Sequence, residues 1–362
     1  FLDKGGEPVV SRPTGRSGLF SRLEDHSTSV ASPLMGPYYD AMKKILVTGA
    51  AGQIGRELVP ALRDRYGSEE VVAAGHNTSL PEAIKKAGPH TVVDVTSPDQ
   101  IGKVVEEYRI DAIFHLSTIL SALAENEPQK AHEVNINGLY NVLEVAYHSD
   151  IERVLIPSSI AAFGPETPRT CTPNDTIQKP NTLYGIAKVY GELLGNYYSH
   201  KMNLDVRGLR LPGIISCMDF EPTAGTTDYA ILMFFGALRE GYFSCYLQPD
   251  TRLPMMYMPD AIRAIVDLAS ADINQLHHRA DFNIHAMSFT PAELASSIQK
   301  RIPAFEIGYE VDPLRQAIAD SWPEALDDSV ARDEWGWEPL YGIDAMVDDM
   351  LVRVGERLAL AG

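Results

Sequence analysis

The sequence predicts an α/β fold: a doubly wound parallel sheet followed by a smaller C-terminal lobe. Short β-branched runs alternate with helical stretches from Lys43 onward. A glycine-rich turn at residues 49–55 separates the first such run from the first helical stretch. The centres of the runs are largely uncharged, which indicates strands covered on both faces. Together these features are typical of a Rossmann-type sheet.

The expected elements follow from hydrophobic periodicity. We expect strands at residues 45–47, 71–74, 91–93, 112–116, 154–156 and 206–209. We expect helices at residues 57–66, 131–148 and 184–200, where apolar residues recur at helical spacing. This order of strand and helix predicts βαβ units.

Composition changes divide the chain into three parts. Residues 1–41 are rich in Gly, Pro and Ser without apolar periodicity, which predicts a flexible N-terminal arm. Residues 42–215, with parts of 250–290, are expected to form the Rossmann domain. Residues 216–362 are expected to form mainly a smaller substrate-binding lobe, because prolines break the chain between its helices.

The arm leaves the compartment open. Its three arginines suggest a mitochondrial presequence, whereas Asp3, Glu7, Glu24 and Asp25 count against one because transit peptides avoid acids. A vector remnant or an over-long start fits equally, and the chain is then expected to be cytoplasmic.

Bulk composition excludes several classes of protein. No run approaches the roughly 18 apolar residues of a membrane span, so we expect a soluble protein. A formal charge of −18 disfavours nucleic acid as a partner. The 3 cysteines are odd in number and lack CxxC spacing, which argues against disulfides and zinc. The pair His277 and His278 lacks metal-binding spacing and is expected in a solvated loop, so no metal is expected.

The glycine-rich turn reads Gly49-Ala50-Ala51-Gly52-Gln53-Ile54-Gly55. Glycine at this spacing allows a tight turn and lets a pyrophosphate approach main-chain amides at the start of a helix. A purely structural turn is the alternative. Because the turn follows the first strand and opens a helix, the context favours dinucleotide binding.

The stretch after the second strand bears on the choice of dinucleotide. The acid that normally holds the adenosine ribose is missing, and His76, Asn77 or Thr78 would take its place. No Lys or Arg stands there for a 2′-phosphate, so NAD is favoured over NADP. Asp94, beside Val95, has two interpretations: acceptor for the adenine amino group, or N-cap of the helix that Pro98 opens.

Tyr184 and Lys188 form a YxxxK pair on one face of a predicted helix. A nearby cation is expected to lower the pKa of the phenol and so allow Tyr184 to act as an acid/base. Pro157-Ser158-Ser159, at the end of a strand, brings a hydroxyl that can polarise a substrate oxygen. Glycine turn, strand-end serine and YxxxK in this order predict an oxidoreductase.

These residues resemble the extended short-chain dehydrogenase/reductase superfamily, over residues 43–352. Several dispersed segments resemble its threonine dehydrogenase branch in particular: His115 to Ala122, Ser158 to Pro165, Thr176 to Pro180, Gly225 to Tyr229, Ser321 to Pro323 and Asp327 to Ser329. Such dispersed matches are far more specific than YxxxK alone.

The resemblance implies roles for individual residues. Ser159 would be the catalytic serine, Tyr184 the acid/base and Lys188 its modulator. Ser121, Thr226 and Thr227 would line the amino-acid pocket with Ser159 and Tyr184. NAD would contact Gly49, Gly52, Gln53, Ile54, Gly55, His76, Asn77, Asp94, Val95, Leu116, Ser117, Asn135, Tyr184, Lys188, Leu211 and Ile214. Ser117 and Thr118 depart from the family, which more often has two alanines there.

The resemblance also implies a reaction, in which L-threonine and NAD give L-2-amino-3-oxobutanoate and NADH in threonine catabolism. A nucleotide-sugar epimerase or dehydratase is the first alternative, since it would use the same Ser, Tyr and Lys. Residues 217–235 contain no Lys or Arg for its diphosphate, which favours a small zwitterion. A non-catalytic NAD-binding protein is the second alternative.

Two expectations concern packing. The helices at 131–148 and 184–200 combine apolar stripes with small and aromatic residues, and with the resemblance they predict a homodimer through four paired helices. Trp322 is expected to be a core anchor more readily than a substrate contact, as are Trp335 and Trp337.

Overall fold

The computed structural model describes residues 42–217 and 225–361. The expected arm at residues 1–41, with the presequence hypothesis attached to it, lies outside the described residues. Part of the segment 217–235 also lies outside them.

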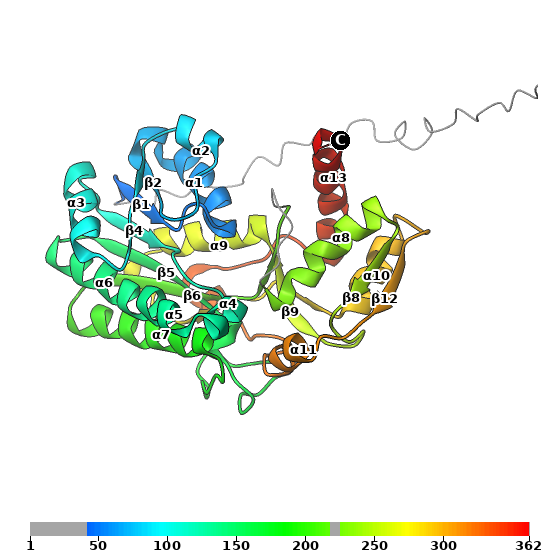
Figure 1. The fold of residues 1–362 in the computed structure, drawn as a ribbon. Helices are drawn as coiled ribbons and strands as arrows, with labels where there is room; N and C mark the ends of the chain where they lie inside the picture. Colours follow the sequence, from blue (N-terminus) through cyan, green and yellow to red (C-terminus); the bar gives the residue numbers. More distant parts are fainter. Residues whose placement is uncertain (1–41, 218–224, 362) are drawn as a thin grey trace, which may run out of the picture. The chain divides into compact units, whose positions relative to one another are not determined.

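A seven-stranded sheet of parallel pairings forms the larger part of the fold, as predicted (Figure 1). Its strand order is β10-β6-β5-β4-β1-β2-β3. The strands are β1 (Ile45–Thr48), β2 (Val71–Gly75), β3 (His90–Val92), β4 (Ala112–His115), β5 (Arg153–Ser159), β6 (Asp205–Leu211) and β10 (Phe282–Asn283). The order reverses between β1 and β4, and ligands of such sheets bind at the carboxyl ends of the strands there.

Helices cover both faces of this sheet (Figure 1). Alternate residues of each strand face opposite sides, so Val47 packs with α1 (Gln53–Tyr66) and α9 (Met258–Ser270), whereas Leu46 packs with the helices of the other face. Those helices are α3 (Pro98–Tyr108), α6 (Leu139–His148) and α7 (Leu183–Lys201). The fully apolar runs of β1 and β2 are therefore explained by burial on both sides.

The C-terminal part has two smaller sheets and a core of its own. One sheet has the order β11-β9-β7, and the other pairs β12 with β8. The strands are β7 (Gly213–Ile215), β8 (Tyr242–Cys245), β9 (Leu253–Tyr257), β11 (Met287–Phe289) and β12 (Glu306–Tyr309). The helices are α8 (Tyr229–Arg239), α10 (Pro291–Gln299), α11 (Pro313–Asp320), α12 (Ser329–Trp335) and α13 (Ile343–Ala361).

Segments from residues 250–290 return to the large sheet. β10 pairs with β6 at its edge, and α9 packs against α1 and the strands below it. The chain thus crosses between the two parts more than once, which ties the C-terminal core to the large sheet.

Two helices differ from the sequence prediction. α1 begins at Gln53, four residues before the expected start, because the glycine turn leads directly into it. The helix expected at 131–148 is α5 (Pro128–His132), a π-helical segment (Glu133–Gly138) and α6. Periodicity predicted the helical run but not the wider turn within it. The short helices α2 (Glu82–Lys86) and α4 (Ser121–Asn126) were not predicted.

The strand interiors are less uniformly apolar than the sequence analysis assumed. Arg207, in β6, is 0% exposed and donates to both Asp205 oxygens and to the carbonyls of Leu268 and Ala271. Arg153 in β5 donates to the same carboxylate, with Nε 2.7 Å from Asp205 Oδ2. The β5–β6 pair is therefore tied by a buried ion pair at its amino-terminal end.

Two further features concern the described residues alone. Cys171, Cys217 and Cys245 form no disulfide. Within the described ranges, no helix has both the length and the apolar character that crossing a membrane requires.

Asp205→Asn should lower the free energy of unfolding by about 3 kcal/mol, because it leaves two guanidinium groups without their carboxylate. Burial opposes ionisation of Asp205, but Arg207 and Arg153 outweigh it and lower its pKa. The stabilisation is therefore present above the unfolded-state pKa and is lost as pH falls through the folded-state pKa. Urea unfolding at several pH values measures both effects. Asp64→Ala, at an exposed position of α1, is the control and should change stability by less than about 0.5 kcal/mol.

Candidate active site

The glycine turn forms a shelf at the carboxyl end of β1. Gly49 has φ +66°, and a Cβ there would lie 2.7 Å from the backbone of Leu116 and Ser117, so only glycine fits. Gly52 is the N-cap of α1 and has no side chain to cover the first amides of the helix. These amides can therefore receive a phosphate, and the shelf fits the pyrophosphate of a dinucleotide.

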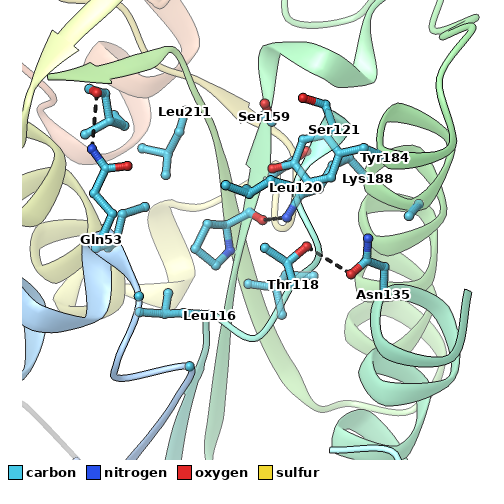
Figure 2. A pocket seen from close by; sticks show the side chains of 18 of the residues that line it. Gln53, Leu116, Thr118, Leu120, Ser121, Asn135, Ser159, Tyr184, Lys188 and Leu211 are labelled. Carbon is cyan, nitrogen blue, oxygen red and sulfur yellow. Dashed lines mark hydrogen bonds between the residues drawn. The ribbon is translucent and has the colours of Figure 1, made fainter. Parts of the chain in front are cut away.

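A cavity runs from this shelf across the carboxyl ends of β4, β5 and β6 to the start of α7 (Figure 2). It brings together most of the residues that the sequence analysis named: Gly49, Gly52, Gln53, Ile54, Gly55, Leu116, Ser117, Ser121, Asn135, Ser159, Tyr184, Lys188, Leu211, Ile214 and Thr227. Gln53 Nε2 donates to Ser216 Oγ at 2.8 Å, which ties the shelf to the segment after β7. The position of these residues in the cavity agrees with the roles proposed for them. The roles themselves stay predictions.

The residues proposed for the adenosine end lie outside the cavity lining. His76 and Asn77 are exposed, and His76 Nε2 lies 3.8 Å from Asp94 Oδ2. Asp94 Oδ1 accepts from the backbone N and the hydroxyl of Thr96, so it closes a local turn. The N-cap of α3 is Ser97 rather than Asp94. The other oxygen of Asp94, Oδ2, is the one that lies near His76.

Two other proposed residues are buried instead of lining the cavity. Val95 is in the core, where it packs against Gly138 of the π-helical segment. Thr226 is 3% exposed, whereas its neighbour Thr227 lines the cavity. The resemblance could not distinguish these neighbours, because a short helical turn at Thr226–Asp228 directs them differently.

The Tyr184, Lys188 and Ser159 side chains meet at the end of the cavity (Figure 2). Lys188 Nζ lies 5.2 Å from the centre of the Tyr184 ring and donates to the Pro157 carbonyl at 2.7 Å. Burial raises the pKa of Tyr184 to about 12, against the opposing hydrogen bond with Ser159. The lowered pKa expected from sequence is therefore not found in the protein without ligand, because burial outweighs the nearby groups.

The pKa of Lys188 is shifted in the opposite direction to that of Tyr184, and burial is again the cause. Burial lowers the pKa of Lys188 to about 8, while the charge of Glu192 raises it. Nearby His115 is neutral, since burial and the charge of Lys188 lower its pKa to about 3. Its Nδ1 lies 2.9 Å from Thr48 Oγ1 in the interior of the sheet.

Asn135 serves a purpose that the sequence analysis did not identify. Its Oδ1 accepts from the backbone N of Ile119 at 2.7 Å and from Thr118 Oγ1, and its Nδ2 donates to the Ile119 carbonyl at 2.9 Å. The π-helical segment places Asn135 where it can hold this backbone from both sides. Asn135 thus fixes the loop that carries Ser117 and Ser121.

Sequence reasoning gave no site role to several other lining residues. Ser158 and Glu192 line the cavity, and Glu192 could have been found from its i+4 spacing after Lys188. Trp322 is part of the C-terminal core, as expected, and it also lines the cavity. Arg169 Nε donates to its carbonyl at 3.1 Å, so a contact distant in sequence positions it.

The charge of the lining is sparse. Among the described lining residues, Lys188 is the sole Lys or Arg. Asp228 also lines the cavity, and its Oδ2 accepts from the Gly225 backbone at 2.7 Å. The arrangement suits a small substrate that carries a positive group better than a polyanion.

A metal centre was not expected. Over residues 42–217 and 225–361, no group of three or more His, Cys, Asp or Glu side chains could hold a metal ion. His278 instead pairs with Glu334, with Nδ1 2.7 Å from Oε1, and lies 3.4 Å from Asp175.

Comparisons with known proteins agree with this geometry. The model of the NAD dependent epimerase/dehydratase family matches residues 45–284. A bovine (Bos taurus) protein named L-threonine 3-dehydrogenase, mitochondrial, is 45% identical over 309 residues, which are 85% of this chain and 82% of that protein. The crystal structure of L-threonine dehydrogenase from Clostridium difficile has TM-score 0.84 and 47% identity, covering 87% of this chain and 98% of that one. A GalE-like L-threonine dehydrogenase from Cupriavidus necator, in its holo form, has TM-score 0.82 and 45% identity, covering 86% and 99%.

Asn135→Ala should increase amide exchange in residues 117–121 by about tenfold or more, because losing hydrogen bonds to a part-buried backbone costs about 1–3 kcal/mol. Hydrogen–deuterium exchange with mass spectrometry measures it. Asn141→Ala is the matched control, since Asn141 on α6 donates to Val95 O and not to this loop. Unchanged exchange at 117–121 would show that Asn135 does not hold the loop.

Proposed function

The chain belongs to the NAD dependent epimerase/dehydratase family, and we propose that it is an L-threonine 3-dehydrogenase that uses NAD. The single observation that carries the proposal is the meeting of Ser159, Tyr184 and Lys188 at the end of a cavity that begins at the glycine shelf. The relatives at 45–47% identity that carry this name support the choice of substrate.

The residues of the chain divide the work of alcohol oxidation. Tyr184 takes the hydroxyl proton of L-threonine, and Ser159 holds the same oxygen by a hydrogen bond. Because burial raises the pKa of Tyr184 to about 12, its phenolate requires the positive charge of Lys188. NAD supplies the acceptor for the hydride that leaves the substrate carbon. The products are L-2-amino-3-oxobutanoate, NADH and a proton.

The glycine shelf and the loop after β4 are the parts that would hold NAD. The shelf offers the uncovered amides of α1 to the pyrophosphate, and Leu116, Ser117, Leu211 and Ile214 line the path toward Tyr184. Residues 74–78 contain no Lys or Arg, which supports NAD over NADP.

Selection of an amino acid requires partners for its two charges. We assign the ammonium side to the neighbourhood of Asp228, which lines the cavity. The carboxylate side would be met by hydroxyls and amides, with Ser121 and Thr227 as the available side chains. Thr226, being buried, would act through its backbone or through packing.

A nucleotide-sugar epimerase remains the second candidate, because it would use the same three catalytic side chains. Its diphosphate requires basic partners. Lys188 is the sole Lys or Arg in the described lining, and we assign it to Tyr184 instead. This difference is the reason for preferring threonine. An NAD-binding protein without catalysis would have no use for the arrangement at Tyr184.

NADH formation measured by absorbance should be observed with L-threonine and NAD, and should be much weaker with L-serine, D-threonine or NADP. Tyr184→Phe should reduce the rate by about 10²–10⁴-fold, because it removes the proton acceptor and keeps the ring. Ser121→Ala should mainly raise KM. Turnover of UDP-galactose without any oxidation of threonine would reject the proposal in favour of the epimerase.

We also propose that the chain forms a homodimer through α6 and α7. The two helices lie side by side (Figure 1). Their outer face exposes large apolar side chains: Tyr140, Tyr147, Leu183, Ile186, Leu193 and Tyr197. Leu193 is 63% exposed and Tyr197 53% exposed, which is unusual for neighbours one turn apart on a helix. A twofold axis through this face would make a bundle of four helices and bury the patch.

Leu193→Asp should convert the dimer to monomer at micromolar concentration, because it places two negative charges near the twofold axis. Light scattering after size exclusion gives the mass directly. Leu340→Asp, equally exposed but far from these helices in sequence, should leave the mass unchanged. A wild-type protein that elutes as a monomer at high concentration would refute this interface.

A further inference from the structure

Glu192 is a buried carboxylate on the catalytic helix that the reaction proposed above does not use. It follows Tyr184 by eight residues and Lys188 by four, so the three side chains share one face of α7. Its side chain is 2% exposed, and it lines the cavity with Lys188. An ionised carboxylate at this depth must be paired, and its pairing partners come from distant parts of the chain.

Four hydrogen bonds satisfy the Glu192 carboxylate. Arg210 of β6 donates from Nη2 to Oε2 at 2.8 Å and from Nε to Oε1 at 3.0 Å. Gln178 donates from Nε2 to Oε2 at 2.6 Å, and Ser158 of β5 donates from Oγ to Oε1. Arg210 is 3% exposed and its Nη1 continues to the Asn174 carbonyl and to Asn283 Oδ1. Both oxygens are thus fixed from three directions.

Three consecutive residues of β5 contact the same face of α7. The Pro157 carbonyl accepts from Lys188, the Ser158 hydroxyl donates to Glu192, and the Ser159 hydroxyl bonds Tyr184. Each contact involves a different turn of the helix. Removing the Glu192 contact would take away one of the three hydrogen bonds that join these residues of β5 to the helix.

We propose that Glu192 is a positioning residue for the catalytic pair: its carboxylate keeps α7 aligned with the end of β5 and supplies the negative charge that keeps Lys188 protonated. The proposal rests on the assignment of Tyr184 and Lys188 as the catalytic pair in the proposed function. It does not depend on which alcohol is oxidised.

The charges around Lys188 support this role. The titratable groups near it include Tyr184 and Glu192 on its own helix and His115 on β4, while Arg210 on β6 contacts the same carboxylate. His115 stays neutral, because its pKa is lowered to about 3. Burial lowers the pKa of Lys188 to about 8 and Glu192 opposes that change. Glu192 is therefore the charge that acts against burial.

The direct test measures the ionisation of Lys188 without substrate or cofactor. The rate of reductive methylation of Lys188 is followed against pH by peptide mass spectrometry, since only the neutral amine reacts. In Glu192→Gln the midpoint should fall by roughly half a unit to one unit, because the amide no longer stabilises the ammonium. Glu192→Asp retains the charge and should return the midpoint toward the wild-type value.

The kinetic readout follows from the same shift. Activity needs protonated Lys188, so it is lost as pH rises through the Lys188 pKa. Lowering that pKa in Glu192→Gln should move the alkaline limb of kcat to lower pH and reduce kcat roughly tenfold, with KM within about twofold. A failure to oxidise threonine would concern the proposed function alone, because the methylation experiment would still report on Glu192.

Asp205→Asn is the matched control. It makes the same carboxylate-to-amide change in another buried ion pair, which lies at the opposite end of β6 and ties that strand to β5 rather than to α7. It should lower the melting temperature and leave the Lys188 midpoint in place. An unchanged Lys188 midpoint in Glu192→Gln, with only a lower melting temperature, would overturn the proposal.

Ser158→Ala covers the case in which Glu192→Gln does not fold. This variant removes one hydrogen bond and leaves the Glu192–Arg210 ion pair intact. We expect kcat to fall at least about threefold with KM unchanged, because a hydrogen bond to a charged group contributes about 1.5–3 kcal/mol. An unchanged kcat in Ser158→Ala would overturn the proposal.

Discussion

The close packing of α7 on the end of β5 is the constraint on which the rest of the site depends. A Cβ at Gly185 would lie 2.2 Å from the Ala161 carbonyl, so the helix reaches this depth only with glycine there. This close packing buries the side chains of Tyr184 and Lys188 on α7. Burial raises the pKa of Tyr184 and lowers that of Lys188. Chemistry and packing are therefore not separable in this part of the molecule.

The charged groups buried around β6 are held in ion pairs. The chain carries a formal charge of −18, and two of its buried arginines are paired with carboxylates, Arg210 with Glu192 and Arg207 with Asp205. Breaking such a pair is far more costly than forming it is favourable, so each fixes the strands that contribute to it. One pair stands at each end of β6, and the strand is held along its whole length.

The sequence predicted much of the fold because it depends on local pattern. Strands such as β1 and helices such as α7 were located within a few residues, and the glycine turn, Ser159, Tyr184 and Lys188 are brought together by parallel strands whose ends meet. The misses depend on tertiary contacts. The pKa of Tyr184 depends on burial, and whether Thr226 or Thr227 faces the cavity depends on one short helical turn. The partners of Arg207 and Arg210 could not be predicted either, since nothing local shows them.

The π-helical segment before α6 sets the angle between two surfaces of the helix, the one that faces the cavity and the one that faces outward. Glu133–Gly138 holds Asn135 toward the cavity, while Tyr140 and Tyr147 beyond it point outward. A π turn accommodates one extra residue, and deleting it would rotate everything that follows by about 100°. Substitutions on the outer surface of α6 can therefore occur without moving Asn135, which holds the loop that carries Ser117. The segment sets the angle between the side of the helix that faces the ligand and the side that we propose as the dimer interface. Single-residue insertions or deletions there should therefore be strongly disfavoured among functional descendants of this chain.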